Sequence, residues 1–261
     1  MDKAQITQKQ TPVLIKMGLW LLILLHILYG LWLLLLIFPH IDINKKHLYI
    51  QKWSKRLLLI FGIELLVVNH SVLKDKPYLL AANHISWIDI HAVNASNPIR
   101  FVAKSEVLSW PIFGWMAMQL GTVFINRASS RHAQQVVNGM SEVLKTESIC
   151  IFPEGTASTL GGAVHPFKPN LFEAAVIAHM PVYSLAIRYI SKETGKRSEV
   201  AAFVGDMGLL ESMGNILKHR NLIVQLTFLP SAASGSNHPS DRKWLAVHSQ
   251  AQVSKILLNT L

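Results

Sequence analysis

Cysteine and charge are scarce in this sequence and glycine is unpatterned, and each of these features excludes a class of protein. The chain of 261 residues has one cysteine, which excludes a disulfide scaffold and a cysteine-only zinc site. Charged residues make up 15% and apolar residues 51%, which excludes an intrinsically disordered chain. The 14 glycines follow no three-residue period, which excludes a collagen-like chain.

Positive charge is in excess, with 25 Lys and Arg against 15 Asp and Glu and a net charge of +10. A basic protein is expected to bind negatively charged partners, and an apolar one is expected to contact an apolar phase. Anionic membrane lipids satisfy both expectations. A nucleic-acid-binding module is disfavoured because the sequence shows no recognised motif for one. The basic residues cluster instead beside an apolar segment, which points to a lipid surface.

One apolar run is long enough to cross a membrane. Residues 17–38 are 22 consecutive positions without Asp, Glu, Lys or Arg. As a helix they would extend roughly 33 Å, against roughly 30 Å for the hydrocarbon core of a bilayer. The run is too long for the core of a signal peptide, and no A-x-A cleavage site follows it. We therefore expect a short tail over residues 1–12 and a transmembrane or membrane-embedded helix over residues 13–38.

The charges that flank this run predict its orientation and a second membrane contact. Three basic residues precede it, Lys3, Lys9 and Lys16, and five follow it, Lys45, Lys46, Lys52, Lys55 and Arg56. The excess on the C-terminal side favours a cytoplasmic location for the rest of the chain. Residues 39–70 are predicted to be a basic interfacial segment. Within it, residues 57–68 are apolar but too short to span, which indicates an interfacial helix passing into a buried strand.

Residues 71–261 alternate short apolar runs with helical patterns, and this alternation predicts an α/β fold. Strands are expected at residues 78–82, 123–125, 148–152 and 182–189, and helices at residues 111–120, 130–146 and 241–258. No internal repeat and no domain linker interrupts this part of the sequence. The fold class predicted for it is a single mixed-sheet domain flanked by helices.

A histidine and an aspartate follow the first of these strands. The sequence reads Asn83-His84-Ile-Ser-Trp-Ile-Asp89, and Ser86 with Asp89 has the spacing of a helix capping box. In that arrangement Asp89 can lean back and accept a hydrogen bond from one imidazole nitrogen of His84, which leaves the other free as a general base. The alternative is a capping aspartate and an ordinary loop histidine. A metal site built from His84, Asp89 and His91 is disfavoured because the spacing is not that of zinc ligands.

Two further stretches end in residues suited to binding a ligand. The strand after Gly121 ends at Arg127, and an arginine there can clamp an anion with two hydrogen bonds. Another strand breaks at Pro153 into the loop Glu154-Gly155-Thr156. Ligands of open α/β sheets bind outside the carboxyl ends of strands, where these loops are expected to lie.

Taken in order, these stretches resemble the four-block signature of the glycerolipid acyltransferases, in particular the bacterial 1-acyl-glycerol-3-phosphate acyltransferases. The blocks are Asn83-His84-x4-Asp89, the stretch from Gly121 to Arg127, Phe152-Pro-Glu-Gly-Thr156, and Pro181-Val182. The likeness covers roughly residues 45 to 230. Lys104 also matches the pattern of the family between the first two blocks.

The resemblance implies acyl transfer from acyl-CoA or acyl-carrier protein to the free hydroxyl of a lysolipid at the bacterial inner membrane, with the catalytic domain on the cytoplasmic side. His84 would be the general base and Asp89 would orient it. Asn83, or backbone amides near His84, would stabilise the oxyanion. The polar head of the acceptor would be held by Lys104, Arg127, Glu154, Gly155 and Thr156. No metal ion and no cofactor are expected, and the absence of a Gly-x-Ser-x-Gly string agrees with direct transfer without an acyl-enzyme.

Departures from the family pattern leave the acceptor open between two lysolipids. Ala157 stands where the members that use phosphate acceptors usually carry Arg, and Asn170 stands where they carry Gly. The tract Gly205-Asp-Met207 looks like the branch that acylates lyso-ornithine lipid. The expected acceptor is 1-acyl-glycerol-3-phosphate, with lyso-ornithine lipid as the alternative. A non-catalytic lipid-binding protein and a lipid hydrolase remain as rival classes.

Overall fold

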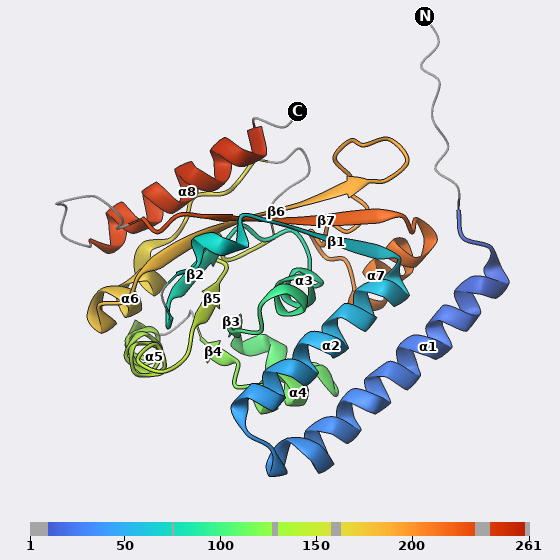
Figure 1. Ribbon diagram of the computed structural model, residues 1–261, viewed down its shortest axis with the longest axis horizontal. Coiled ribbons are helices and arrows are strands. Elements are labelled where there is room, and N and C mark those ends of the chain that lie inside the picture. Colours follow the sequence, from blue (N-terminus) through green and yellow to red (C-terminus); the bar gives the residue numbers. More distant parts are fainter. Residues whose placement is uncertain (1–9, 75, 127–129, 158–162, 233–240, 259–261) are drawn as a thin grey trace, which may run out of the picture.

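The structure is a computed structural model that describes residues 10–74, 76–126, 130–157, 163–232 and 241–258 (Figure 1). Within them, seven strands form one sheet in the order β1-β7-β6-β2-β5-β3-β4. The strands are β1 (Ile63–Val68), β2 (Leu79–Ala82), β3 (Arg100–Lys104), β4 (Val123–Ile125), β5 (Ile149–Ile151), β6 (Val182–Ser191) and β7 (Leu222–Leu229). β6 and β7 pair antiparallel and all other neighbours pair parallel, which confirms the predicted mixed sheet.

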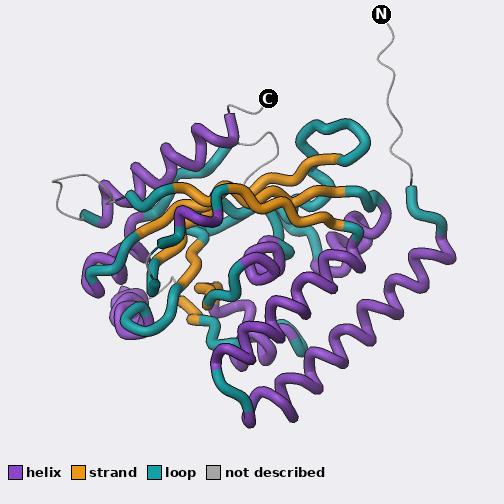
Figure 2. The backbone as a smooth tube through the Cα atoms, viewed as in Figure 1, coloured by secondary structure: helices purple, strands orange, loops and turns teal. Residues whose placement is uncertain are grey.

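Helices cover both faces of the sheet, which runs between them as a single twisted band (Figures 1 and 2). One face packs against α1 (Val13–Trp32), α2 (Ile43–Phe61), α3 (Asp89–Ser96) and α7 (Leu209–Lys218). The other packs against α5 (Ser130–Val143), α6 (Glu173–Ala178) and α8 (Arg242–Leu258). A short helix, α4 (Phe113–Gln119), packs through Met116 against Leu33, Leu34 and Phe38, which follow α1 in the chain.

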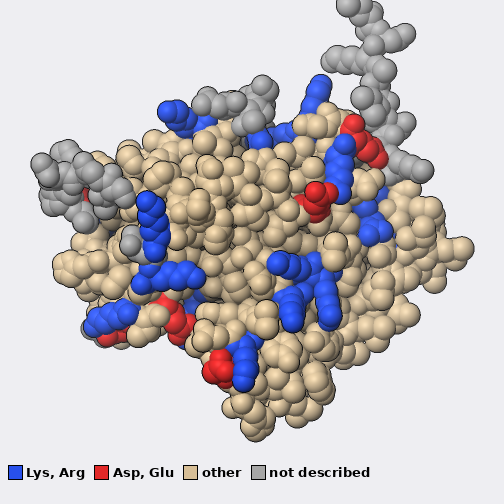
Figure 3. All heavy atoms as spheres, viewed as in Figure 1, with Lys and Arg blue, Asp and Glu red and all other residues tan. Residues whose placement is uncertain are grey.

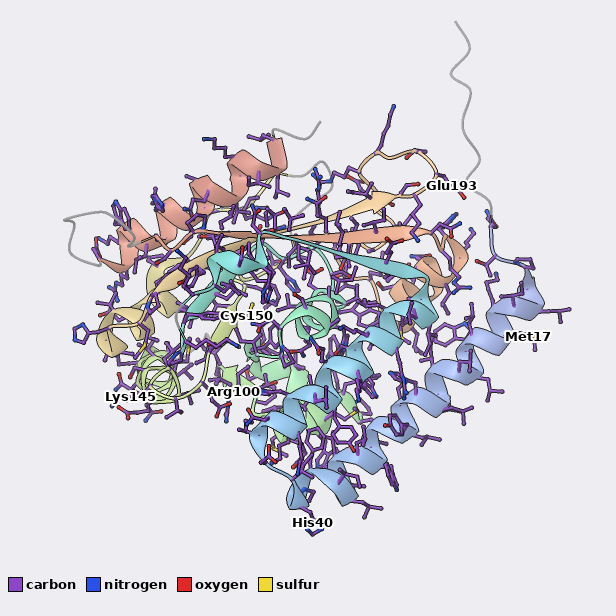
Figure 4. The ribbon with its side chains drawn as sticks, in the orientation of Figure 1. Met17, His40, Arg100, Lys145, Cys150 and Glu193 are labelled. Atoms are coloured by element: carbon purple, nitrogen blue, oxygen red, sulfur yellow. The ribbon has the colours of Figure 1, made fainter. Side chains whose placement is uncertain are left out.

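The predicted strands and helices of the α/β domain are present, with small shifts at their ends. β4 has the predicted bounds, while the strand expected at residues 148–152 is the three-residue β5. Cys150 (labelled in Figure 4) is the middle residue of β5 and is fully buried. Burial raises the pKa of its thiol well above the ordinary value, so this cysteine is an inert part of the core.

The N-terminal apolar run forms a helical stretch over residues 13–40 that is long and apolar enough to cross a membrane. It consists of α1, a π-helical turn (Leu33–Ile37) and a 3₁₀ turn (Phe38–His40), after which the chain reverses into α2. α1 and α2 lie side by side (Figure 1), and many apolar side chains of α1, such as Leu14, Leu21 and Leu28, are exposed. The single polar residue in the middle of α1, His26, is hydrogen-bonded to the backbone carbonyl of Trp53 at 3.0 Å.

Two expectations for the following segment differ from the structure. β1 was expected to be buried, and that is wrong, because β1 is an edge strand that exposes Glu64, Leu66 and Val67. β1 also belongs to the sheet, so the expected domain boundary at residue 71 lies beyond the first strand of the sheet. The chain passes from α2 into β1 through Gly62, whose φ of +70° lies in the left-handed region that glycine adopts without strain.

Candidate active site

The candidate site lies at the carboxyl ends of the parallel strands β2, β5, β3 and β4. Since these strands run in one direction, the residues that follow them meet at one edge of the sheet. β2 delivers Asn83 and His84, β5 delivers Phe152 to Thr156, and β3 ends at Lys104. Arg127, which follows β4, lies outside the described residues. β6 is longer than β2 and extends beyond it, alongside the loop that carries His84.

His84 and Asp89 form a hydrogen-bonded pair. Nδ1 of His84 lies 2.9 Å from Oδ2 of Asp89, and because a carboxylate oxygen only accepts, Nδ1 carries the hydrogen. The Asp89 side chain is fully buried, whereas that of His84 is 23% exposed. The imidazole also stacks on the ring of Phe152, with the ring centres 4.1 Å apart. The pair therefore holds the imidazole in one orientation with Nε2 on its opposite side.

The helix start predicted at Ser86 is wrong, although one of the two hydrogen bonds of a capping box, from the Ser86 amide to the Asp89 carboxylate, is present. α3 begins at Asp89 itself, three residues later than expected, and residues 86–89 form a turn closed by the Asp89 amide and the Ser86 carbonyl. Oδ2 of Asp89 also accepts the backbone amides of Ile85 at 2.7 Å and Ser86 at 2.9 Å. The Asp89 carboxylate therefore stabilises the loop of residues 84–86 through its backbone amides and also orients the His84 ring.

Asp89 has a further partner that the sequence analysis missed. The hydroxyl of Tyr189 on β6 donates to Oδ1 of Asp89 at 2.6 Å. Burial, and then the negative charge of Asp89, raise the pKa of Tyr189 well above its ordinary value, so the phenol keeps its proton and remains a donor. The two residues are 100 positions apart in sequence. No local pattern could join them, because the pairing depends on β6 lying next to β2.

Glu154 binds the protein backbone, whereas the family resemblance implies a contact with the head group of the acceptor. It is buried, its Oε1 accepts the backbone amide of His84 at 2.8 Å, and its Oε2 accepts that of His165 at 2.7 Å. The neighbouring Gly155 has a φ of +78°, a conformation that favours glycine. The Glu154 carboxylate thus joins the loop after β5 to the loop that carries the histidine.

Asn83 is likewise engaged with the backbone. Its side-chain amide donates to the carbonyl of Ile187 at 3.0 Å and its side-chain oxygen accepts the amide of Ile187 at 2.8 Å. The amides of His84, Ile85 and Ser86, expected as possible oxyanion donors, bind Glu154 and Asp89. These groups build the loop, so an oxyanion would need donors from elsewhere at this edge of the sheet.

A large apolar cavity adjoins the histidine. Its volume is about 470 Å³, and His84, Phe152, Gly155, Thr156 and Lys104 lie along its wall. It continues between the helices α1 to α4, where the lining includes Ile27, Gly30, Leu34, Trp53, His91 and Met116. The cavity is also lined by Ala157, which replaces the usual arginine of the family, and by Gly205, which begins the tract that resembles the lyso-ornithine branch. The cavity therefore leads from the imidazole to the α1–α2 hairpin.

Of the predicted site residues, the structure brings His84, Asp89, Lys104, Gly155 and Thr156 together around or directly behind this cavity. Lys104 and Thr156 are exposed, so both are accessible to a polar ligand. Within the described residues, no group of three or more His, Cys, Asp or Glu side chains is placed to hold a metal ion. An acid-paired histidine beside an apolar cavity is suited to removing a proton from a lipid-borne group.

Several known acyltransferases are similar to this chain. Residues 64–188 match the family model described as Acyltransferase. The 1-acyl-sn-glycerol-3-phosphate acyltransferase of Neisseria gonorrhoeae is 39% identical over 152 residues, which are 58% of this chain and 58% of that protein. The lyso-ornithine lipid O-acyltransferase of Pseudomonas aeruginosa is 33% identical over 210 residues, covering 80% of this chain and 78% of that protein.

The fold is also that of a solved relative. The crystal structure of the 1-acyl-sn-glycerophosphate (LPA) acyltransferase PlsC from Thermotoga maritima superposes with a TM-score of 0.65 at 20% identity, covering 94% of this chain and 96% of that one. This likeness confirms the predicted fold class. The match to the Pseudomonas enzyme over most of both lengths shows that the chain belongs to the acyltransferase family.

Proposed function

We propose that the protein is a membrane-bound O-acyltransferase that moves a fatty acyl group from a thioester to the free hydroxyl of a lysolipid. The observation that supports it most is the 2.9 Å contact between His84 and Asp89 beside a cavity of about 470 Å³ lined largely by apolar side chains. A lysolipid and an acyl chain need such an apolar space, and the hydroxyl needs a base next to it.

In the proposed reaction Nε2 of His84 removes the proton from the acceptor hydroxyl while Asp89 stabilises the imidazolium. The alkoxide oxygen attacks the thioester carbonyl, a C–O bond forms and the C–S bond breaks. The leaving thiolate takes the proton back from the imidazolium, which restores neutral His84. The donor is proposed to be acyl-CoA or acyl-carrier protein, with no metal ion or cofactor.

For the acceptor we propose 1-acyl-glycerol-3-phosphate, the substrate named for the Neisseria relative. A specific observation supports lyso-ornithine lipid as a second candidate. Ala157 and Gly205 both line the cavity, so the position without the usual arginine and the tract that resembles the lyso-ornithine branch lie where an acceptor would bind. Lys104 on the wall of the cavity is the proposed contact for the head group in either case, together with Thr156 and Arg127.

We further propose that residues 13–38 anchor the enzyme in the bacterial inner membrane with the α/β domain in the cytoplasm. The exposed apolar side chains of α1 and the cavity that reaches it support this placement, because a lysolipid could then enter from the bilayer. The excess of basic residues after the segment supports the cytoplasmic side.

The test is an assay of the full chain in lipid nanodiscs with labelled acyl-CoA and a panel of lysolipids. Wild-type protein should form the diacyl product, and His84→Ala should lower kcat by about a hundredfold or more while the protein still inserts into vesicles. Retained turnover in His84→Ala would remove His84 as the base. Release of free fatty acid without acceptor would identify a hydrolase instead, and no turnover with any acceptor or with acyl-carrier protein would indicate a lipid-binding protein.

A further inference from the structure

The carboxylate of Asp89 is held from two different elements of the fold. Oδ2 accepts three hydrogen bonds, all from residues 84–86 of the loop that Asp89 closes. Oδ1 accepts the hydroxyl of Tyr189, which comes from the sheet. The loop donors fix where Oδ2 lies, while the donor from β6 fixes the rotation of the carboxylate about its Cβ–Cγ bond. The plane of the carboxylate therefore depends on Tyr189.

Tyr189 is placed firmly enough to act in this way. Its side chain is 1% exposed and packs in the core of the sheet, where it follows Tyr183, Leu185 and Ile187 on one face of β6. Two residues before Tyr189 on β6, Ile187 is bonded through both of its backbone groups to the side chain of Asn83. These bonds fix the loop against the same stretch of β6. The distance between the phenol oxygen and Oδ1, 2.6 Å, is that of a strong charge-assisted hydrogen bond.

We infer that Tyr189 is a positioning residue of the acyltransferase, whose phenolic hydroxyl orients Asp89 and, through it, sets the pH range in which His84 can act as a base. The inference rests on the proposed function of the His84–Asp89 pair. Tyr189 does not touch the reacting atoms in this role. Its hydroxyl donates a hydrogen bond that partly compensates the negative charge of the carboxylate, so the attraction between Asp89 and the His84 imidazolium is weaker.

The sign of the effect follows from this division of charge. Without the phenolic donor, the charge of Asp89 is compensated less and attracts the His84 imidazolium more strongly. The imidazolium then loses its proton at a higher pH, and the acidic limb of the pH–rate profile moves upward. Other ionisable groups near the pair are Glu154, which holds the His84 backbone, Cys150 on β5, and His91 on α3. All are kept unchanged in the variants below.

The first experiment is Tyr189→Phe, assayed as full chain in nanodiscs. We expect kcat to fall about tenfold, the KM for the lysolipid to stay within about twofold, and the acidic limb of kcat/KM to rise by about half a pH unit or more. The matched control is Tyr78→Phe, because Tyr78 is also a fully buried tyrosine of the same core and its hydroxyl accepts a hydrogen bond from Asn97. Tyr78→Phe should lower the melting temperature without moving the pH profile.

A second variant gives a shift of opposite sign and does not remove the hydroxyl. Site-specific 3-fluorotyrosine at position 189 is a stronger donor of nearly the same shape, so it should move the acidic limb to lower pH. NMR titration of the His84 ring, assigned by its loss in His84→Ala, should show the same two shifts without any turnover. The inference is overturned if Tyr189→Phe and the fluorinated protein both keep the wild-type profile, or if Tyr78→Phe moves it equally. A wild-type protein without turnover would count against the proposed function, while the NMR titration would still decide the role of Tyr189.

Discussion

Glu154 is a buried carboxylate that joins two loops of the site. Its two oxygens accept the backbone amides of His84 and His165, so it fixes the position of the histidine backbone. Glu154→Gln replaces one accepting oxygen by an NH₂ group and leaves one of these buried amides facing a donor. We expect a cost of about 1–3 kcal/mol, observed as a lower melting temperature and a kcat lowered about tenfold or more, with little change in the KM for the acceptor.

The control for this variant is Glu142→Gln, because Glu142 is exposed on α5 and its carboxylate pairs with Lys145 at the surface. It should leave both kcat and KM unchanged. A result in which Glu154→Gln raises the KM for the lysolipid at constant kcat would instead support the direct contact with the head group that the sequence predicts.

His91 offers a prediction about pH and stability. It lies on α3, faces the cavity, and burial lowers its pKa from 6.5 to about 4. Below pH 6.5 the unfolded chain therefore takes up a proton at this residue that the folded protein does not take up until about pH 4. The contribution of neutral His91 to the free energy of unfolding is therefore fully present above pH 6.5 and is lost as the pH falls toward 4.

The measurement is the melting temperature of the protein in detergent between pH 7 and about pH 4.5, the range in which the unfolded chain binds this proton and the folded protein largely does not. His91→Gln should flatten the fall of melting temperature with decreasing pH. The control is His40→Gln, because His40 is exposed at the turn between the α1 stretch and α2 (labelled in Figure 4). Equal slopes for wild-type protein and His91→Gln would contradict the assignment.

The residues of the site differ in how far the sequence predicts them. His84 and Asp89 are five positions apart in one loop, so a local pattern suffices to find them and their contact. Glu154 is recognisable as a loop residue at a strand end, but whether its oxygens meet a ligand or a backbone amide depends on the path of two other loops. Tyr189 leaves no signal, since nothing in the strand from Val182 to Ser191 says which of its side chains faces the loop after β2.

At the scale of the element, the sequence predicts several strands correctly but not their places in the sheet, and the interior strands β3 and β7 are not among those predicted. β2, β5 and most of β6 are buried apolar runs, and the partly buried edge strand β4 is a short apolar run between polar residues. β1 is a largely apolar run as well, but its place at the edge of the sheet is set by pairing with β7 from the other end of the domain. Pairing between distant strands is a property of the topology, and composition does not encode it.

The contact between α1 and α2 sets the shape of the cavity at its far end. Gly30 lines the cavity, and a Cβ at this position would lie 2.8 Å from Nε1 of Trp53 and 3.1 Å from Cε of Met116. Nε1 of Trp53 donates to the carbonyl of His26, so the indole cannot shift without losing that bond. Gly30→Val should therefore narrow the cavity and also loosen the hairpin, at a cost of about 1–3 kcal/mol.

We expect Gly30→Val to lower kcat/KM for palmitoyl-CoA about tenfold relative to octanoyl-CoA, because only the longer chain would need the space beside Gly30. Gly18→Val on the same helix is the control, since a Cβ there would meet nothing within 4 Å. The selectivity is measured by competition between the two donors. An unchanged ratio in Gly30→Val would mean that the acyl chain does not reach this part of the cavity.

At the scale of the whole molecule, apolar surface and positive charge lie on the same side. The α1 helix exposes its leucines, and its neighbour α2 exposes Lys52, Lys55 and Arg56. Figure 3 shows lysine and arginine side chains gathered over the part of the surface that α2 occupies in Figure 1. α8 carries exposed lysines on the opposite face of the sheet, which lies away from the hairpin. Membrane binding should therefore combine an apolar part from α1 with an electrostatic part from α2.

The prediction concerns binding of the full chain to vesicles of phosphatidylglycerol or phosphatidylcholine, measured by co-sedimentation at low and high salt. A lysine near an anionic surface contributes about 1 kcal/mol, so Lys52→Gln/Lys55→Gln should weaken binding to phosphatidylglycerol about thirtyfold. Its binding to phosphatidylcholine should be unchanged, because α1 is intact, and its salt dependence should decrease. The matched control, Lys243→Gln/Lys255→Gln on α8, removes the same charge from the other face and should leave all four measurements as in wild-type protein. If both double variants weaken binding equally, the net charge of +10 rather than the face beside α1 determines the interaction with anionic lipid.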